Sequence, residues 1–269
     1  CIARRRHAAS GRMLMRACGL VSVSFRDKTP AQIVDAAHAC GLACIEWGSD
    51  VHAPADDPAR CAAIAALCAA HGIRVSSYGT YFRIGRDAPR DFAPYLDAAA
   101  ALGTKILRLW CGTKGYAAYT ADELGGLFAD CRKIEKMAAA ADVTVCMECH
   151  GGTVTDCVEG AKALMDAVGS AHFRMYWQPN QFRTVAENLR YAAFCAPYTE
   201  IVHVFSWQGK AKYPLRGAAD IWRQYLACFP ACVPLLLEFM PDDRIESLAN
   251  EAAALRKIAA LAGSGAGEG

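Results

Sequence analysis

Four polar residues recur at intervals that suit a shared chemical site: Glu148, Gln178, His203 and Glu238. Successive members are separated by 30, 25 and 35 residues. Each ends or follows a short run of aliphatic, β-branched and aromatic residues, which predicts the carboxyl end of a buried strand. Carboxylates are costly to bury without a partner, and oxygen and imidazole donors suit Mn²⁺, Mg²⁺, Co²⁺ or Zn²⁺. The set therefore predicts one divalent metal site.

The elements that would bring these residues together are short strands that alternate with helices. Eight strands are predicted, at Gly19–Phe25, Ala43–Trp47, Arg74–Tyr78, Lys105–Trp110, Val143–Glu148, Phe173–Trp177, Glu200–Phe205 and Val233–Phe239. Between them, Thr29, Thr120 and Thr184 each begin a pattern in which Glu or Gln follows three residues later. This pattern is typical of the capping box that opens a helix.

Eight strand–helix units predict a single (β/α)8 TIM barrel, because parallel strands need right-handed crossovers and eight of them close into a barrel. A doubly wound open sheet is the alternative, but it is expected to carry a glycine-rich phosphate loop after the first strand. Residues 22–29 contain no glycine. The predicted catalytic domain spans residues 13–262, between a disordered N-terminal extension (1–12) and a flexible tail (263–269).

Alternation along the fifth strand indicates which side chains reach the barrel interior. Thr144, Cys146, Glu148 and His150 fall on one face, so Cys149 is expected to point toward the helices. Strands in a sheet lie ~5 Å apart, which lets four adjacent strand ends converge on one point. The Cys146-x-x-Cys149 spacing lies within a strand, so we interpret it as packing rather than as a redox or zinc motif.

Other residues near the strand ends are candidates for substrate binding: Glu46, His52, Trp110, His150, Trp177, Trp207 and Arg216. For Glu46 the equal alternative is a buried partner for Arg108. The tryptophans are interpreted as pocket walls that exclude water, with simple packing as the alternative. Lys210, Lys212 and Arg216 follow the seventh strand. They are interpreted either as contacts for a phosphate or carboxylate of the substrate or as part of a solvated loop.

Composition limits the class of protein. The chain has 269 residues, 54% of them hydrophobic, and a formal net charge of +2, which gives no sign of a nucleic-acid or membrane partner. No segment approaches the ~18 apolar residues of a membrane span. Its 14 cysteines fall largely where small apolar residues would serve, which indicates a reducing, cytoplasmic setting. The oligomeric state, including a homo-oligomer, is left open.

Six motifs occur in order along residues 17–260: Gly41–Gly48, Ile106–Trp110, Glu148–His150 with Thr153 and Thr155, Trp177–Asn180, His203–Trp207 and Leu237–Phe239. In this order and spacing the sequence resembles the sugar phosphate isomerase/epimerase group of the xylose-isomerase-like TIM barrels. The resemblance implies that Glu148, His203 and Glu238 bind one metal ion and that the two acids transfer protons. Gln178 stands where an Asp is usual in that group.

The resemblance implies a divalent-metal-dependent isomerase or epimerase acting on a sugar, a sugar phosphate or a related polyol or keto acid. The proton would move next to a metal-polarised carbonyl. A lyase on the same scaffold, either an inosose-type dehydratase or a C-glycoside deglycosylase, is the first alternative. A catalytically silent sugar-binding barrel is the second. An isomer keeps the substrate mass, whereas a lyase releases water or an aglycone.

Overall fold

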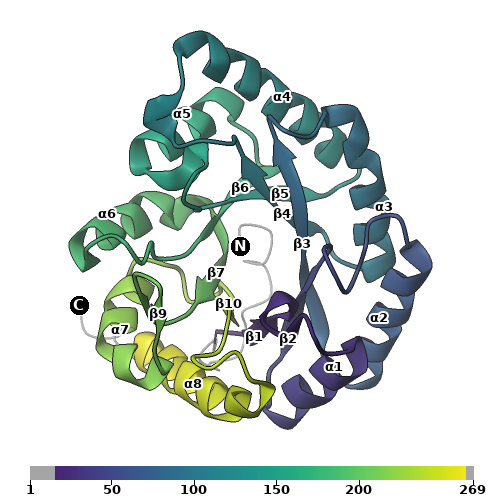
Figure 1. Ribbon diagram of the computed structural model, residues 1–269, viewed down its shortest axis with the longest axis vertical. Helices are drawn as coiled ribbons and strands as arrows, with labels where there is room; N and C mark the ends of the chain where they lie inside the picture. The colour runs from purple at the N-terminus through teal and green to yellow at the C-terminus, as the bar shows by residue number, and fades with distance from the viewer. Residues whose placement is uncertain (1–15, 265–269) are drawn as a thin grey trace, which may run out of the picture.

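The structure, a computed structural model, describes residues 16–264 and contains a closed barrel of eight parallel strands. The strands follow one another around the barrel in the order β1-β10-β7-β6-β5-β4-β3-β2, and Figure 1 looks down into the ring that they form. The predicted single (β/α)8 barrel is confirmed. The predicted extension, residues 1–12, lies outside the described residues, as do residues 265–269 of the predicted tail.

The barrel strands are short and lie where the sequence places them: β1 (Cys18–Val21), β2 (Cys44–Gly48), β3 (Arg74–Ile84), β4 (Ile106–Cys111), β5 (Thr144–Glu148), β6 (Phe173–Trp177), β7 (Thr199–Val204) and β10 (Leu235–Leu237). A two-stranded antiparallel hairpin, β8 (Trp207–Gln208) with β9 (Ala211–Lys212), follows β7. Most strand residues are buried, as expected where helices cover the outside and side chains fill the inside.

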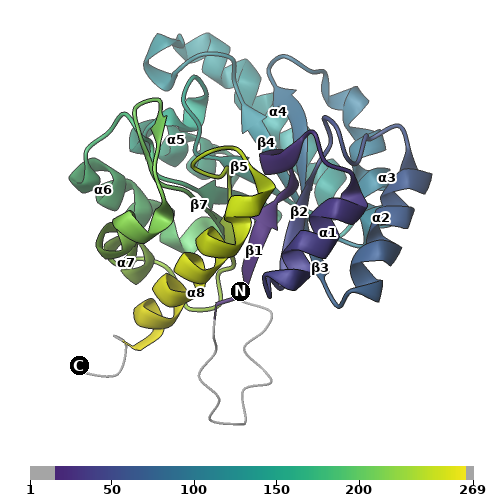
Figure 2. The same ribbon diagram turned by 60° about the horizontal axis from the view of Figure 1, so that its bottom comes forward.

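The helices form an outer ring: α1 (Pro30–Ala39), α2 (Pro58–Ala70), α3 (Ala93–Leu102), α4 (Ala121–Ala140), α5 (Val158–Val168), α6 (Val185–Cys195), α7 (Ala219–Ala227) and α8 (Leu248–Ser264). Figure 2 shows them surrounding the strands. Thr29, Thr120 and Thr184 form the three predicted capping boxes. No helix among residues 16–264 is long and apolar enough to cross a membrane.

Three strands differ from their predicted bounds by more than one residue at an end. β10 covers Leu235–Leu237 and is two residues shorter than predicted at each end. β1 ends at Val21 and a 3-10 turn, Ser22–Phe25, follows it. β3 continues to Ile84 instead of ending before Gly79. A Cβ on Gly79 would lie 2.6 Å from Oε1 of Glu46 and 3.0 Å from a guanidinium nitrogen of Arg108. The glycine therefore permits a close approach of buried charged groups and does not end the strand.

The barrel interior is filled below the strand ends. Its floor is a buried cluster that includes Val21, Cys44, Cys146, Tyr176 and Leu236. A filled interior restricts ligands to the mouth at the carboxyl ends of the strands, as is usual in this fold. As predicted, the two cysteines of the C-x-x-C spacing point in different directions. Cys146 belongs to this floor, whereas the sulfur of Cys149 lies 3.8 Å from that of Cys195 in α6.

Candidate active site

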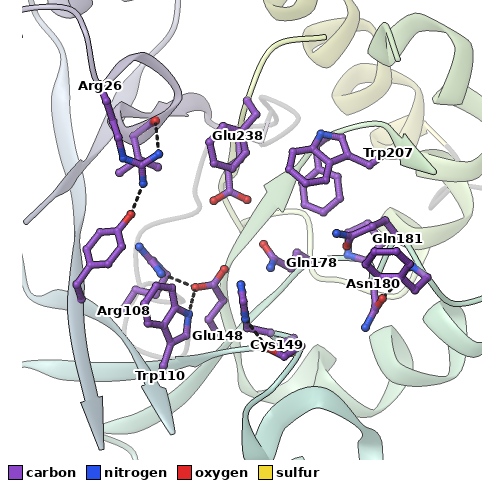
Figure 3. A pocket seen from close by; sticks show the side chains of 18 residues that line it. Arg26, Arg108, Trp110, Glu148, Cys149, Gln178, Asn180, Gln181, Trp207 and Glu238 are labelled. Carbon is purple, nitrogen blue, oxygen red and sulfur yellow. Dashed lines mark hydrogen bonds and ion pairs between the residues drawn. The ribbon is translucent and has the colours of Figure 1, made fainter. Parts of the chain in front are cut away.

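Three of the predicted ligands meet at the barrel mouth. Glu148 ends β5, His203 lies in β7 and Glu238 follows β10. Each offers one ligand atom, and these atoms lie within 4.8 Å of one another. All three residues are buried. In Figure 3 the side chains of Glu148 and Glu238 point toward each other across a pocket, and Gln178 reaches in from a third side.

Glu148, Gln178 and Glu238 line a cavity of about 530 Å³ that opens at the barrel mouth, whereas His203 is fully buried and does not line it. Six aromatic side chains share the lining: Tyr81, Trp110, Phe182, Phe205, Trp207 and Phe239. A few convergent polar groups within aromatic walls are typical of a site for a small molecule.

Two donors hold Glu148 in place through one carboxylate oxygen. Nε1 of Trp110 donates to its Oε2 at 2.6 Å, and a guanidinium nitrogen of Arg108 forms a buried ion pair with the same oxygen. Burial alone would raise the pKa of Glu148, but the Arg108 charge lowers it overall. Glu148 is therefore ionised at neutral pH, and its Oε1 remains directed toward His203, 3.9 Å from Nδ1.

His203 is surrounded by carboxylates. Its Nδ1 lies 3.5 Å from Oε2 of Glu238, and its Nε2 lies 3.5 Å from Oε2 of Glu46. Burial favours the neutral ring, yet the charges of Glu238 and Glu46 outweigh it and raise the pKa of His203 to about 10. Neither ring nitrogen has a hydrogen-bond partner among the described residues.

Glu46 and Arg108 form a buried pair beneath the cavity. Nε of Arg108 lies 3.1 Å from Oε1 of Glu46, and the hydroxyl of Ser77 donates to Oε2 at 2.9 Å. Burial would raise the pKa of Glu46, but His203 and Arg108 lower it to about 2. Glu46, Glu148 and Glu238 together with Arg108 carry a net charge of −2 when the acids are ionised and His203 is neutral.

A divalent cation fits this cluster. A divalent ion would neutralise the net charge of −2. Protonation of His203 alone would leave a net charge of −1. Both ring nitrogens of His203 and Oε1 of Gln178 are buried without a hydrogen-bond partner among residues 16–264. A metal ion would take the place of the proton on Nδ1 of His203. Two carboxylates, one imidazole and one amide are also the donor types that hard divalent ions accept. Glu148, Gln178, His203 and Glu238 are thus the residues that could hold the metal.

The family is shown by sequence comparison. Residues 34–212 match the family model described as xylose isomerase-like TIM barrel. The chain belongs to this family. No curated protein matches the sequence at a significant level.

Solved structures of similar fold include several members of the family. One is a xylose isomerase-like TIM barrel protein from Mycobacterium smegmatis in complex with magnesium, with a TM-score of 0.67 and 13% identity over 92% of this chain and 97% of that one. Another is the probable 3-DHS dehydratase AsbF from Bacillus anthracis, with a TM-score of 0.70 and 16% identity over 90% and 98%. A third is D-allulose 3-epimerase from Methylomonas sp., with 0.66 and 14% over 91% and 98%. At these identities the likeness establishes the fold alone.

Within this family fold, three predicted substrate contacts line the cavity: Trp110, His150 and Trp207. The rings of Trp110 and His150 are 5.3 Å apart. The hydroxyl of Thr155 donates to the main-chain oxygen of Glu148 at 2.5 Å, and that of Thr153 donates to the oxygen of His150 at 2.6 Å. These bonds fix the turn after β5, which presents His150 to the cavity.

Four other predicted contacts lie elsewhere. Glu46 lies beneath the cavity, where it forms an ion pair with Arg108 and does not line the cavity. Both ring nitrogens of His52 are occupied, 3.2 Å from Oγ of Ser22 and 3.1 Å from the oxygen of Lys28. Trp177 is fully buried on the helix side of β6 against Trp222, Tyr225 and Phe229, because alternation turns Gln178 and not Trp177 inward. Arg216 is exposed and lines neither cavity at the barrel mouth.

Arg26 and Tyr81 are among the lining residues that were not predicted from the sequence. Arg26 pairs with Asp50 at 2.6 Å and donates to the hydroxyl of Tyr81. Tyr81 belongs to the part of β3 that continues past Gly79. The run Thr80–Ile84 is rich in β-branched and aromatic residues, and this signal would have extended the predicted strand.

Proposed function

We propose that this chain is a divalent-metal-dependent epimerase or isomerase that moves a proton next to the carbonyl of a small carbohydrate. The observation that carries the proposal is the convergence of Glu148, His203 and Glu238, whose ligand atoms lie within 4.8 Å of one another. Glu148 and Glu238 line the aromatic pocket, and His203 is fully buried next to them. A buried cluster that keeps a net negative charge is costly, so this group indicates a bound cation and a functional role.

In this proposal Oε1 of Glu148, Nδ1 of His203, Glu238 and the amide oxygen of Gln178 hold the metal. The metal, when bound, would polarise the substrate carbonyl and acidify the neighbouring C–H. Arg108 and Trp110 keep Glu148 ionised through its other oxygen and fix its direction. Glu46 faces Nε2 of His203 and favours a proton there, which leaves Nδ1 free as a ligand.

The proton transfer is assigned to Glu148 and Glu238. They approach the pocket from opposite sides (Figure 3), which suits removal of a proton from one face of a carbon and its return to the other. This arrangement favours epimerisation. Aldose–ketose isomerisation requires proton transfer on only one face of the reacting carbon. It would use the same residues and is the other reaction that we propose.

A neutral sugar or polyol suits the pocket better than a sugar phosphate. Of the described residues that line it, the guanidinium groups belong to Arg26 and Arg108, and both are paired with carboxylates. The side chain of Lys212 pairs with Asp243. The aromatic walls would pack against the apolar faces of a sugar ring and exclude water. The many buried thiols favour a reducing, cytoplasmic location.

The test is turnover of unphosphorylated and phosphorylated ketoses and aldoses with added Mn²⁺ in D₂O, followed by mass spectrometry and NMR. The proposal expects an isomeric product that carries one solvent deuterium on the reacting carbon. Product formed without deuterium would indicate a hydride shift. Absence of turnover across the panel, together with absence of Mn²⁺ binding, would overturn the proposal.

A lyase is the second candidate, and the structural likeness to a dehydratase supports it. The same carboxylates would remove a proton beside the carbonyl and protonate the departing hydroxyl, so that water is released and a double bond forms. The experiment above separates the two reactions, because a dehydration product is lighter than its substrate by one water.

A further inference from the structure

A second cavity of about 300 Å³ lies beside the first at the barrel mouth. It is bounded by the loop after β6, the segment that follows β7, and helix α7. Five residues line both cavities: Pro179, Asn180, Gln181, Phe205 and Trp207. The two cavities therefore share one wall, and a molecule seated in the first needs to extend only past these side chains to reach the second.

The lining of the second cavity is largely aromatic and aliphatic. It includes Val185, Tyr213, Ile221, Trp222 and Tyr225. Nε1 of Trp222 is already engaged, since it donates to the oxygen of Phe205 at 2.9 Å. Such a lining offers dispersion contacts and a dry surface, which suit a planar apolar group.

Two of the polar side chains that reach this cavity, Asn188 and Arg183, are engaged within the protein. The side chain of Asn188 accepts from the main-chain nitrogen of Asn180 at 2.9 Å and donates to its oxygen at 3.1 Å. Arg183, the only cation among the described residues of this lining, donates to the main-chain oxygen of Asp156 at 2.5 Å. These bonds argue against a site built for an anion.

Exposed aromatic residues stand at the rims of both cavities. Phe182 is 69% exposed and lines the first cavity, and Tyr213 is 46% exposed and lines the second. The β8–β9 hairpin is tied to the loop after β6, because the nitrogen of Gly209 donates to the oxygen of Gln181 at 3.0 Å. Large apolar side chains left open to solvent around a cavity typically mark a binding surface.

We propose that the second cavity is a subsite for a planar, uncharged aromatic or apolar group attached to the sugar. The substrate is then a glycoside-like conjugate that keeps a carbonyl on its sugar. The sugar occupies the first cavity, and the apolar part occupies the second. This assignment rests on the proposed function, which places the sugar beside Glu148 and Glu238.

Gly217 offers a way to fill the second cavity without touching the first. It lines only the second of the two, and an added Cβ would meet no atom within 4 Å. Gly217→Phe would add a ring at this wall of the subsite, and Gly217→Ala is the matched control for the change of backbone residue. A melting curve for each variant shows whether it is folded.

The experiment measures binding to the Mn²⁺-loaded full chain. The ligands are glucose, galactose and xylose, their phenyl β-glycosides, glucose 6-phosphate and galactose 6-phosphate, and phenol. Calorimetry and saturation-transfer NMR give the affinities. Burial of a phenyl ring raises affinity by roughly 10- to 100-fold. At least one phenyl glycoside should therefore bind the wild type more tightly than its parent sugar by this factor. Gly217→Phe should abolish the gain and leave the free sugar unaffected, and Gly217→Ala should keep it.

Four results would overturn the subsite. Equal affinity of all three phenyl glycosides and their sugars would do so while leaving the proposed function intact. A gain that survives in a folded Gly217→Phe would place the ring elsewhere. Sugar 6-phosphates that bind more tightly than the phenyl glycosides, with that advantage lost in Gly217→Phe, would identify an anion site. If no sugar binds, phenol tests the cavity by itself. Phenol that binds the wild type and Gly217→Ala but not Gly217→Phe supports the apolar subsite, and absence of phenol binding to the wild type rejects it. Loss of the proposed function is recognised separately by the Mn²⁺ titration.

Discussion

Nε2 of His203 lies 3.5 Å from Oε2 of Glu46, on the opposite edge of the ring from the nitrogen that faces Glu148 and Glu238. A carboxylate behind a metal-binding imidazole fixes its tautomer and raises its basicity. Glu46 is itself held by Arg108 and Ser77. This places Glu46 as a positioning residue for the proposed metal site.

Glu46→Gln should weaken Mn²⁺ binding by about 10- to 100-fold, because the neutral amide no longer favours the required tautomer of His203. The measurement is a titration of metal-free protein with Mn²⁺. Glu200→Gln is the matched control, since it removes the acid from another Arg–Glu pair, 3.2 Å from Arg174. Equal affinities of Glu46→Gln and the control would show that Glu46 has no such role.

Glu148→Gln and Glu238→Gln should each reduce turnover by about 10²- to 10⁴-fold, the usual cost of losing a positioned acid or base. Steady-state assays on the substrate found by the panel provide the measurement, and melting curves check the fold. A folded variant with near-normal turnover would remove that residue from the proton transfer.

Gln178→Asp should tighten Mn²⁺ binding, because Oε1 of Gln178 is buried without a partner and a carboxylate there attracts the cation more strongly. The titration compares the variant with the wild type at one pH and ionic strength. Unchanged affinity would place Gln178 outside the ligand set, where it would instead contact the substrate. Failure of both proteins to bind Mn²⁺ would reject the metal site.

Glu251 allows a test of pH-dependent stability away from the site. Burial raises its pKa, although the nitrogen of Leu215 donates to its carboxylate at 2.9 Å. A raised pKa in the folded state means that stability is highest below the unfolded pKa of about 4.3 and falls as pH rises through the folded value. Glu251→Gln should therefore gain melting temperature relative to the wild type between pH 4 and pH 8. A constant difference across that range would contradict the prediction.

The sequence alone was sufficient to predict the barrel and the order of its strands, since both follow from local patterns. Capping residues at Thr29, Thr120 and Thr184 mark helix starts by bonds within one turn. The spacing of Glu148, Gln178, His203 and Glu238 reflects one strand–helix unit per step, and parallel topology then brings them to one mouth.

Tertiary structure alone decided which neighbouring side chains share that mouth. Trp177 and Gln178 are adjacent in sequence, so alternation lets only one of them face the cavity. The structure shows that Gln178 faces the cavity and that Trp177 packs under α7. Both ring nitrogens of His52 are occupied by contacts with Ser22 and Lys28. These contacts join separate loops, so no sequence periodicity predicts them. Arg108 in β4 pairs with Glu46 in β2 and with Glu148 in β5, and Gly79 in β3 leaves room for the first pair. Such long-range contacts exist only once the barrel has closed.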